Sequence, residues 1–299
     1  MIRFLQHHEI NREVWDACIS RSCQGLIYGH SWYLDIVSPG WCALEMDEYS
    51  AIMPLPVKKK YGINYIIQPL FAQQLGIFSE QALSPDAHEE FFKAIPLNYK
   101  FVALNLNFAN AAHNQSIPLV WNKNYELLFD RDYQSLAGLY SANTKRNLQK
   151  AKDIVVTFDG GIDGLLAMKS GNTAKNRRRI SIEKIRDFMN SVKALNSGFV
   201  CSASLEGHEC AAVFFLQHEK RIYYLIPVSN SLGKEKKAMF AIVDHVIQKF
   251  AGTNIILDFE GSNISGIARF FEGFGAVNHQ YPSLKINRMP FPLNQFRKS

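Results

Sequence analysis

The sequence predicts a mixed α/β protein that is built from two domains, and three observations support this prediction. The chain has 299 residues, which suits one large domain or two domains of about 150 residues. Hydrophobic residues make up 47% of the chain and charged residues 20%, a globular composition that excludes disordered, collagen-like and coiled-coil proteins. The second half is predicted to contain helices, then an antiparallel meander, then alternating strands and helices, which is the order of a mixed sheet with crossover helices.

The first half is predicted to open with helices and to continue into a β-rich stretch. We expect helices at residues 12–20 and 29–37, followed by β-rich sequence over residues 41–78. Within that stretch residues 51–57 and 65–69 are expected to form short strands, and their prolines place these strands at an edge or at a bulge. The three lysines between them, followed by Tyr-Gly, indicate the tip of a hairpin.

A helix start and a domain boundary complete the first half. Ser84 precedes a proline and suits the N-cap of a helix, with acidic residues in the first turn. Residues 101–108 alternate between apolar and polar side chains as a strand should. The pattern breaks at a proline and polar residues within 116–124, so we divide the chain into domains 1–124 and 125–299.

The second half alternates helical and strand patterns. It is predicted to begin with a strand and one long helix, and to place a basic loop at residues 175–179. A meander of three strands with tight connections follows, and then strands alternate with helices. The expected strands are 125–129, 154–158, 198–205, 209–217, 221–228, 254–259 and 282–287, and the expected helices are 132–152, 162–172, 181–196, 235–250 and 265–274.

The second half of the chain carries a net positive charge, whereas the first half carries a small net negative charge. Residues 1–124 hold 9 Lys and Arg against 11 Asp and Glu, whereas residues 125–299 hold 24 against 16, and the whole chain has a net charge of +6. This asymmetry predicts that the second half meets an anion, either nucleic acid or a phosphorylated small molecule such as a nucleotide or coenzyme A.

The cysteines and the N-terminal sequence indicate a cytoplasmic protein. The chain has five cysteines, an odd number, and no C-x-x-C pair, so neither a disulfide framework nor a zinc ribbon is indicated. No run approaches the roughly 18 apolar residues of a membrane span, and the N-terminus lacks the apolar stretch of a signal peptide. We expect a reducing compartment, no membrane span and no metal.

A lysine-rich segment between a strand end and a helix start is the first candidate site. The unpaired amides and positive dipole end of a helix N-terminus bind phosphate, and a pyrophosphate would suit this segment. The alternative is a solvated turn that leads into a lysine-rich helix. The donor-binding candidates are Ser231, Leu232, Gly233, Lys234, Glu235, Lys236 and Lys237.

Two carboxylates at the end of a predicted strand form the second candidate. The strand is expected to deliver Asp258 and Glu260 to one face, and Gly261 lets the backbone turn into a helix. A carboxylate beside a helix start can serve as a general base or hold a substrate amine. The alternative is that either carboxylate braces the turn or pairs with Arg269.

This strand-turn-helix resembles the tandem acyltransferases of the GNAT superfamily, which include the Fem-type aminoacyl and peptidyl transferases and their acetyltransferase-like relatives. The resemblance covers most of the chain. Its signature stands here as Asp258-Phe259, Ser262, Arg269-Phe270 and Phe274-Gly275-Ala276. Supporting it are Trp32-Tyr33, the segment Met53-Pro54-Leu55-Pro56 with the hairpin after it, and Thr144-Lys145-Arg146-Asn147-Leu148 followed by Lys150-Ala151.

The resemblance implies two GNAT-like subdomains, with acceptor contacts from residues 1–124 and acyl-donor binding mainly in residues 125–299. Relatives commonly carry a lysine after the Arg-Phe pair, where this chain has Phe271, and the Arg/Gln-x-x-Gly-x-Gly/Ala coenzyme A loop is absent. The sequence therefore does not identify the acyl donor. Residues 181–196 form one modest predicted helix, so the long helical insertion of the Fem enzymes is also missing, which argues against a peptidoglycan-bridge transferase.

Several polar and aromatic residues complete the candidate site. Tyr224 and Tyr281 could donate a proton to a leaving thiolate, although core packing is the alternative for both. The basic residues of 175–179 could hold phosphates or form a solvated turn. Packing is the alternative for most of the acceptor-binding candidates, which are Trp32, Tyr33, Gln68, Phe71, Gln73, Gln74 and Arg269.

Taken together, these features predict an N-acyltransferase. The sequence lacks the G-x-S-x-G, G-x-x-x-x-G-K-[ST], G-x-G-x-x-G and H-E-x-x-H motifs, which argues against hydrolases, nucleotide hydrolases, nicotinamide oxidoreductases and zinc proteases. We expect transfer of an acyl group from a thioester, acetyl-coenzyme A or another acyl-coenzyme A, to the amine of a small molecule or peptide. The alternatives are an aminoacyl-tRNA-dependent Fem-type transferase, which would bind RNA, and a non-catalytic binding protein on the same fold.

Overall fold

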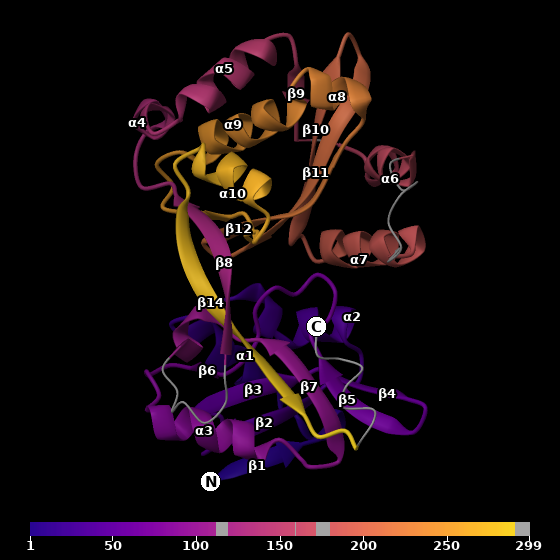
Figure 1. The fold of residues 1–299 in the computed structure, drawn as a ribbon, viewed down its shortest axis with the longest axis vertical. Coiled ribbons are helices and arrows are strands. Elements are labelled where there is room, and N and C mark those ends of the chain that lie inside the picture. Colours follow the sequence, from indigo (N-terminus) through magenta and orange to yellow (C-terminus); the bar gives the residue numbers. More distant parts are fainter. Residues whose placement is uncertain (112–118, 159, 172–179, 291–299) are drawn as a thin grey trace. The chain divides into compact units, whose positions relative to one another are not determined.

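The computed structural model describes residues 1–111, 119–158, 160–171 and 180–290 (Figure 1). The chain divides into two compact units, of which the first is Met1–Asn122 with Gln280–Ser299 and the second is Lys123–His279. The sequence-based division has one boundary, between residues 124 and 125. The structure divides the chain two residues earlier and returns its C-terminal segment to the first unit.

The first unit contains a four-stranded antiparallel sheet in the order β1-β2-β3-β6. β3 is an inner strand between β2 and β6 rather than the edge strand that its proline predicted, and it accommodates Pro54 beyond the two residues that pair with β6. Helices α1 and α3 pack against this sheet. The elements are β1 Ile2–Leu5, α1 Arg12–Arg21, α2 Ser31–Val37, β2 Cys42–Met46, β3 Ala51–Leu55, β6 Phe78–Ser79 and α3 Pro85–Ala94, with short 3-10 helices at His7–Glu9, Ile27–Gly29 and Phe108–Ala111.

The remaining strands of the first unit follow the order β4-β5-β7-β14. β4 (Val57–Lys60) and β5 (Ile63–Ile67) form the predicted hairpin, whose tip Tyr61-Gly62 has φ angles of 51° and 76°. β5 pairs in parallel with β7 (Tyr99–Asn105), and β7 pairs antiparallel with the second half of β14 (Val277–Asn287).

The second unit is built on a mixed sheet in the order β8-β13-β12-β11-β10-β9. The meander β10-β11-β12 is antiparallel, as predicted, and β12 pairs in parallel with β13. The strands are β8 Leu119–Leu128, which begins in the first unit, β9 Val155–Thr157, β10 Gly198–Leu205, β11 His208–His218, β12 Arg221–Ser229 and β13 Ile256–Asp258. The helices are α4 Tyr133–Gly138, α5 Ala142–Lys150, α6 Ile162–Gly171, α7 Ile182–Ala194, α8 Ser231–Glu235, α9 Ala238–Phe250 and α10 Ser265–Glu272.

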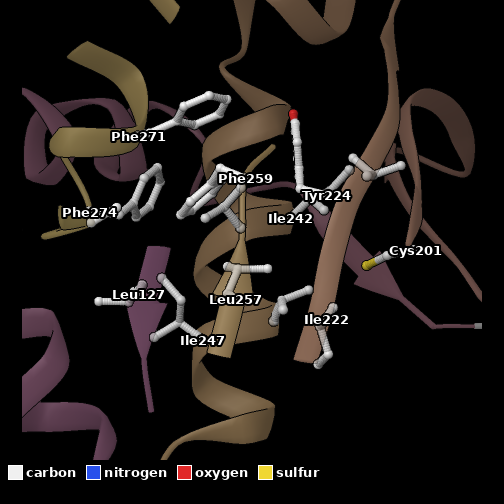
Figure 2. Close-up of a cluster of buried hydrophobic side chains, with 14 of the residues drawn as sticks. Leu127, Cys201, Ile222, Tyr224, Ile242, Ile247, Leu257, Phe259, Phe271 and Phe274 are labelled. Atoms are coloured by element: carbon white, nitrogen blue, oxygen red, sulfur yellow. The ribbon is translucent and has the colours of Figure 1, made fainter. Parts of the chain in front are cut away.

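Helices cover both faces of this sheet because side chains alternate along its strands. On β11, Val213 and Phe215 belong to the core that packs against α9, whereas Phe214 between them contacts Phe188 of α7 at a ring distance of 6.2 Å. Residues from α9, α10 and the strands β8, β12 and β13 converge in the main core (Figure 2).

The structure corrects two sequence expectations in this unit. The sequence predicts a single helix over residues 132–152, but the structure has two helices there. Ser141 caps α5, because its side chain accepts a hydrogen bond from the Thr144 amide at 3.1 Å. The Ser141 amide donates to the Gly273 carbonyl oxygen at 2.9 Å. The loop expected before residue 235 is instead the short helix α8, separated from α9 by Lys237, whose φ is 61°. No helix among the described residues is long and apolar enough to cross a membrane.

Candidate functional site

The strands β12 and β13 separate at their carboxyl ends. Their parallel pairing extends only from Arg221 to Tyr223 on β12, although this strand continues to Ser229. After β13 the chain turns through Glu260 and Gly261, which have φ angles of 55° and 63°. Gly261 is required here, because a Cβ atom would lie 2.0 Å from the Lys123 carbonyl oxygen.

A cavity of about 610 Å³ lies where these strands separate. Its walls come from four segments of the second unit. β12 contributes Tyr224, Leu225, Pro227 and Ser229, and the turn after β13 contributes Phe259, Glu260, Gly261 and Ser262. The α8–α9 segment contributes Gly233, Lys234, Lys237, Met239 and Phe240, and α10 contributes Gly266, Ile267, Phe270 and Phe271. The cavity therefore brings together several donor-binding candidates with Glu260 and Tyr224.

The predicted phosphate loop is folded as a helical turn. The Asn230 side chain caps α8 and accepts the amide hydrogen of Gly233 at 2.9 Å, so this amide is already used within the protein. Gly233 packs so closely against β11 that a Cβ atom would lie 2.2 Å from the Cys210 carbonyl oxygen. Of the four charged residues in the segment, Lys234 and Lys237 line the cavity.

The other donor-binding candidates lie outside the cavity wall. Ser231 and Glu235 are exposed, and Leu232 packs against the core. Lys236 approaches Glu235, with 3.9 Å between the ammonium and carboxylate atoms. The basic segment 175–179 lies outside the described residues.

The two candidate carboxylates do not share a face, which corrects the sequence expectation. β13 ends at Asp258, and the left-handed backbone of Glu260 directs the chain away from the strand. Glu260 is half-buried in the cavity wall, whereas Asp258 is fully buried behind it. Asp258 Oδ1 accepts the Glu260 amide hydrogen at 2.8 Å and so holds the turn.

A buried ion network surrounds Asp258. Arg221 Nη1 donates to Asp258 Oδ2 at 2.9 Å and to Glu126 Oε1 at 2.8 Å, and Asn124 also donates to Glu126 at 3.1 Å. Burial raises the pKa of Asp258 to about 6, Arg221 opposes this rise, and the second carboxylate, Glu126, adds to it. One guanidinium thus serves two carboxylates in the core.

The two tyrosine candidates lie in different units. Tyr224 is 7% exposed, lines the cavity and contacts Phe215. Its ring also contacts those of Phe259 and Phe271 (Figure 2). Burial raises the pKa of Tyr224, so its hydroxyl keeps its proton at neutral pH. Tyr281 lies in β14, in the segment that belongs to the first unit, and does not line the cavity.

The aromatic acceptor candidates pack within the first unit. Tyr33 is fully buried and its hydroxyl donates to the Phe71 carbonyl oxygen. The Trp32 ring contacts the Tyr33 ring edge-on, with 5.5 Å between the ring centres.

The glutamine candidates brace the segment between β5 and β6. Gln68 donates to the Ala72 carbonyl oxygen at 2.8 Å and accepts the Asn105 amide hydrogen at 3.0 Å. Gln74 donates to the Gln73 side chain at 2.8 Å, and the Asn105 side chain donates to the Gln73 carbonyl oxygen at 2.9 Å. These amides therefore tie the segment to β7.

Arg269 lies at a second hollow, of about 740 Å³, beside the first cavity. The two hollows share Phe240, Gly266 and Phe270, and Ser141 also lines the second one. No motif in the sequence marks the apolar wall that the two hollows share. The helical spacing of apolar residues in α9 and α10 was visible, but it does not reveal which of them face a hollow rather than the core.

Several solved structures are similar to this chain over most of its length. No family model and no curated protein matches the sequence. Among solved structures the chain is similar to FemX, with a TM-score of 0.67, 9% identity, and 97% of this chain and 99% of that chain covered. It is also similar to L-PGS from Bacillus licheniformis (TM-score 0.56, 12% identity, 96% and 95% covered) and to a tandem GNAT protein from the clavulanic acid biosynthesis pathway (0.54, 10%, 97% and 99%).

Proposed function

The chain has the tandem GNAT fold of these structures, as the sequence predicted, and from this fold and its cavity we propose that it is an N-acyltransferase. The proposed reaction transfers an acyl group from a coenzyme A thioester to an amine. The observation that carries the proposal is the cavity between β12 and β13, in which strand backbone, two lysines and one carboxylate meet.

The strand backbone supports the proposal because β12 is irregular at the cavity. Phe215 pairs with Tyr224 and Phe214 pairs with Ile226, so Leu225 is an extra residue that bulges out of the ladder. Leu225 lines the cavity beyond the last pair with β13. Backbone groups released in this way are suited to hydrogen-bond a thioester arm and the oxyanion that forms from its carbonyl.

The lysines support an anionic donor. Lys234 and Lys237 line the cavity, and neither forms an ion pair with any residue that the structure describes. α9 begins directly after Lys237 with no side-chain cap, which leaves the positive end of its dipole at the same place. Phosphates of the donor would bind at this end of the cavity.

Glu260 and Tyr224 supply groups for the proton transfers. The amine nitrogen attacks the thioester carbonyl carbon, the carbon–sulfur bond breaks, and the amine loses a proton. Glu260, in the cavity wall, would take that proton or hold the amine in place. Tyr224 would donate its proton to the thiolate as the carbon–sulfur bond breaks, and the proton that Glu260 took would return to Tyr224 through solvent, so that both groups regain their starting states.

The test combines donor binding with turnover. Coenzyme A and acetyl-coenzyme A should raise the melting temperature saturably, and Lys234→Ala with Lys237→Ala should remove that rise, whereas Lys220→Ala in an exposed turn should not. Glu260→Gln should lower the turnover about 10²–10⁴-fold and leave donor affinity nearly intact. Glu206→Gln is a matched control, since Glu206 also has a left-handed φ, of 52°, but lies in an exposed turn. Unchanged turnover in Glu260→Gln would remove this carboxylate from the mechanism.

A second candidate, transfer from aminoacyl-tRNA, is favoured by the exposed face of α5. No acidic residue occurs between Ser141 and Lys152, and this stretch begins at the second hollow, to which it contributes Ser141 and Asn143. Its exposed cations are Lys145, Arg146, Lys150 and Lys152. Binding of tRNA with a steep salt dependence that is reduced by alanines at these positions would favour this donor over coenzyme A.

A further inference from the structure

The cavity described above has both charged groups and an apolar wall. Lys234 and Lys237 lie at the α8–α9 end, and Glu260 lies in the turn after β13. α9 and α10 also contribute the apolar side chains Met239, Phe240, Ile267 and Phe270 to the lining. Such a lining suits an amphipathic anion, with its charged head at the lysines and its apolar part on these side chains.

The apolar wall is built from side chains that hold one another in place. The rings of Phe240 and Phe270 meet edge-on with 4.8 Å between their centres, and Phe259 stacks on Phe271 at 4.6 Å. Ring pairs at these distances are attractive, so the wall is preformed rather than assembled by a ligand. Ile267 is nevertheless 42% exposed, and Phe240 and Phe270 are only half-buried.

The apolar wall presents four side chains, Met239, Phe240, Ile267 and Phe270, which is more than a two-carbon acyl group can cover. A donor with a two-carbon acyl group would leave the α10 side of the wall facing water. An apolar chain on that wall would remove it from water, which is favourable in proportion to the area covered.

Resting on the proposed function, we propose that the acyl group is an extended apolar chain, bound against Ile267 and the Phe240–Phe270 pair. Each methylene buried against such a wall contributes about 0.8 kcal/mol, which corresponds to about a fourfold gain in affinity. An acetyl donor would bind without this gain.

The experiment compares acetyl-, butyryl-, hexanoyl-, octanoyl- and decanoyl-coenzyme A, each below the concentration at which it forms micelles. We expect Kd to fall about fourfold per methylene from butyryl to octanoyl and then to level off as the cavity fills. The kcat/KM for an amine acceptor should rise in the same order.

Two variants on one helix edge locate the chain. Ile267→Ser removes apolar area from the wall and should reduce the gain per methylene, whereas Ile264→Ser should leave it unchanged, because Ile264 is 64% exposed and lies outside both hollows. Both residues are exposed enough for the variants to fold. Equal effects of the two substitutions would overturn the proposed location.

The outcomes also separate this inference from the proposed function. Saturable binding of acetyl-coenzyme A with no dependence on chain length would overturn the chain-length inference and leave the acyltransferase proposal standing. No binding of any coenzyme A derivative would instead contradict the proposed function itself.

Discussion

Replacing Arg221 with methionine tests the buried network that holds the candidate site. Arg221 is 8% exposed and is shared by Asp258, which has no exposed surface, and by the largely buried Glu126. Removing one partner of a buried ion pair costs about 3–5 kcal/mol, because the remaining charge stays buried without compensation. Two features reduce this cost: the Glu126 side chain keeps 14% exposure, and Asp258 can take up a proton. We therefore expect Arg221→Met to lower the free energy of unfolding by about 3–4 kcal/mol at neutral pH, in the lower part of that range.

The loss should depend on pH in a defined direction. The folded-state pKa of Asp258, about 6, lies above the value of about 3.9 for an unfolded chain. The folded state therefore binds the proton more tightly, so the contribution of Asp258 to stability is greatest below about pH 4 and is lost as the pH rises through 6. Without Arg221 the pKa rises further. The destabilisation by Arg221→Met should thus be smaller at pH 5 than at pH 7.

Urea denaturation at both pH values measures these effects through the midpoint and the slope. Arg131→Met is the matched control, since Arg131 forms an ion pair with Asp130 at 2.8 Å on the surface, and it should cause little change. A loss below about 1 kcal/mol for Arg221→Met, or equal losses at the two pH values, would refute the assignment of a buried, uncompensated charge.

Two further predictions concern packing and hydrogen bonds in the second unit. Gly233→Ala should destabilise the fold by about 1–3 kcal/mol and weaken donor binding, because the added Cβ would press on the Cys210 carbonyl oxygen. Gly138→Ala is the control and should cause little change, since Gly138 has open space around it. Equal melting temperatures of the two variants would contradict the prediction. Asp244→Asn should cost about 1.5–3 kcal/mol, because this carboxylate accepts hydrogen bonds from the hydroxyls of Tyr133 and Tyr140 at 3.0 and 2.7 Å. Burial and Asp244 raise the pKa of Tyr133 to about 12. Asp244→Asn should therefore also lower the pKa of Tyr133, which an ultraviolet titration measures. An unchanged pKa would show that burial alone raises it.

Elements marked by local chemistry could be predicted from the sequence. Ser84 accepts the Ala87 amide hydrogen at 3.2 Å and starts α3 where the Ser-Pro pair placed it. The hairpin tip Tyr61-Gly62 and the meander turn Glu206-Gly207 have the left-handed backbone that their glycines favour. In each case the residues that determine the helix start or the turn lie within a few positions of one another, so the element could be predicted without knowing any distant contact.

Elements decided by distant contacts could not be predicted in the same way. Ser141 can sit inside a helix or cap one, and the hydrogen bond from its amide to Gly273, more than a hundred residues later, accompanies the cap. Gly233 has no preference for a helix, yet α8 forms because this glycine alone fits against Cys210 and Asn230 caps the turn. The sequence contains these residues but not the contacts that choose between their conformations.

The candidate carboxylates show the same limit at the site itself. Alternation along a strand would place Asp258 and Glu260 on one face, but the strand ends between them and Glu260 takes a left-handed φ. The first carboxylate therefore enters a buried network with Arg221, and the second reaches the cavity. Their connection is the hydrogen bond from the Glu260 amide to Asp258, so a change in the network should reach the cavity through the backbone of this turn. On this argument Arg221→Met should impair turnover as well as stability, although Arg221 does not line the cavity.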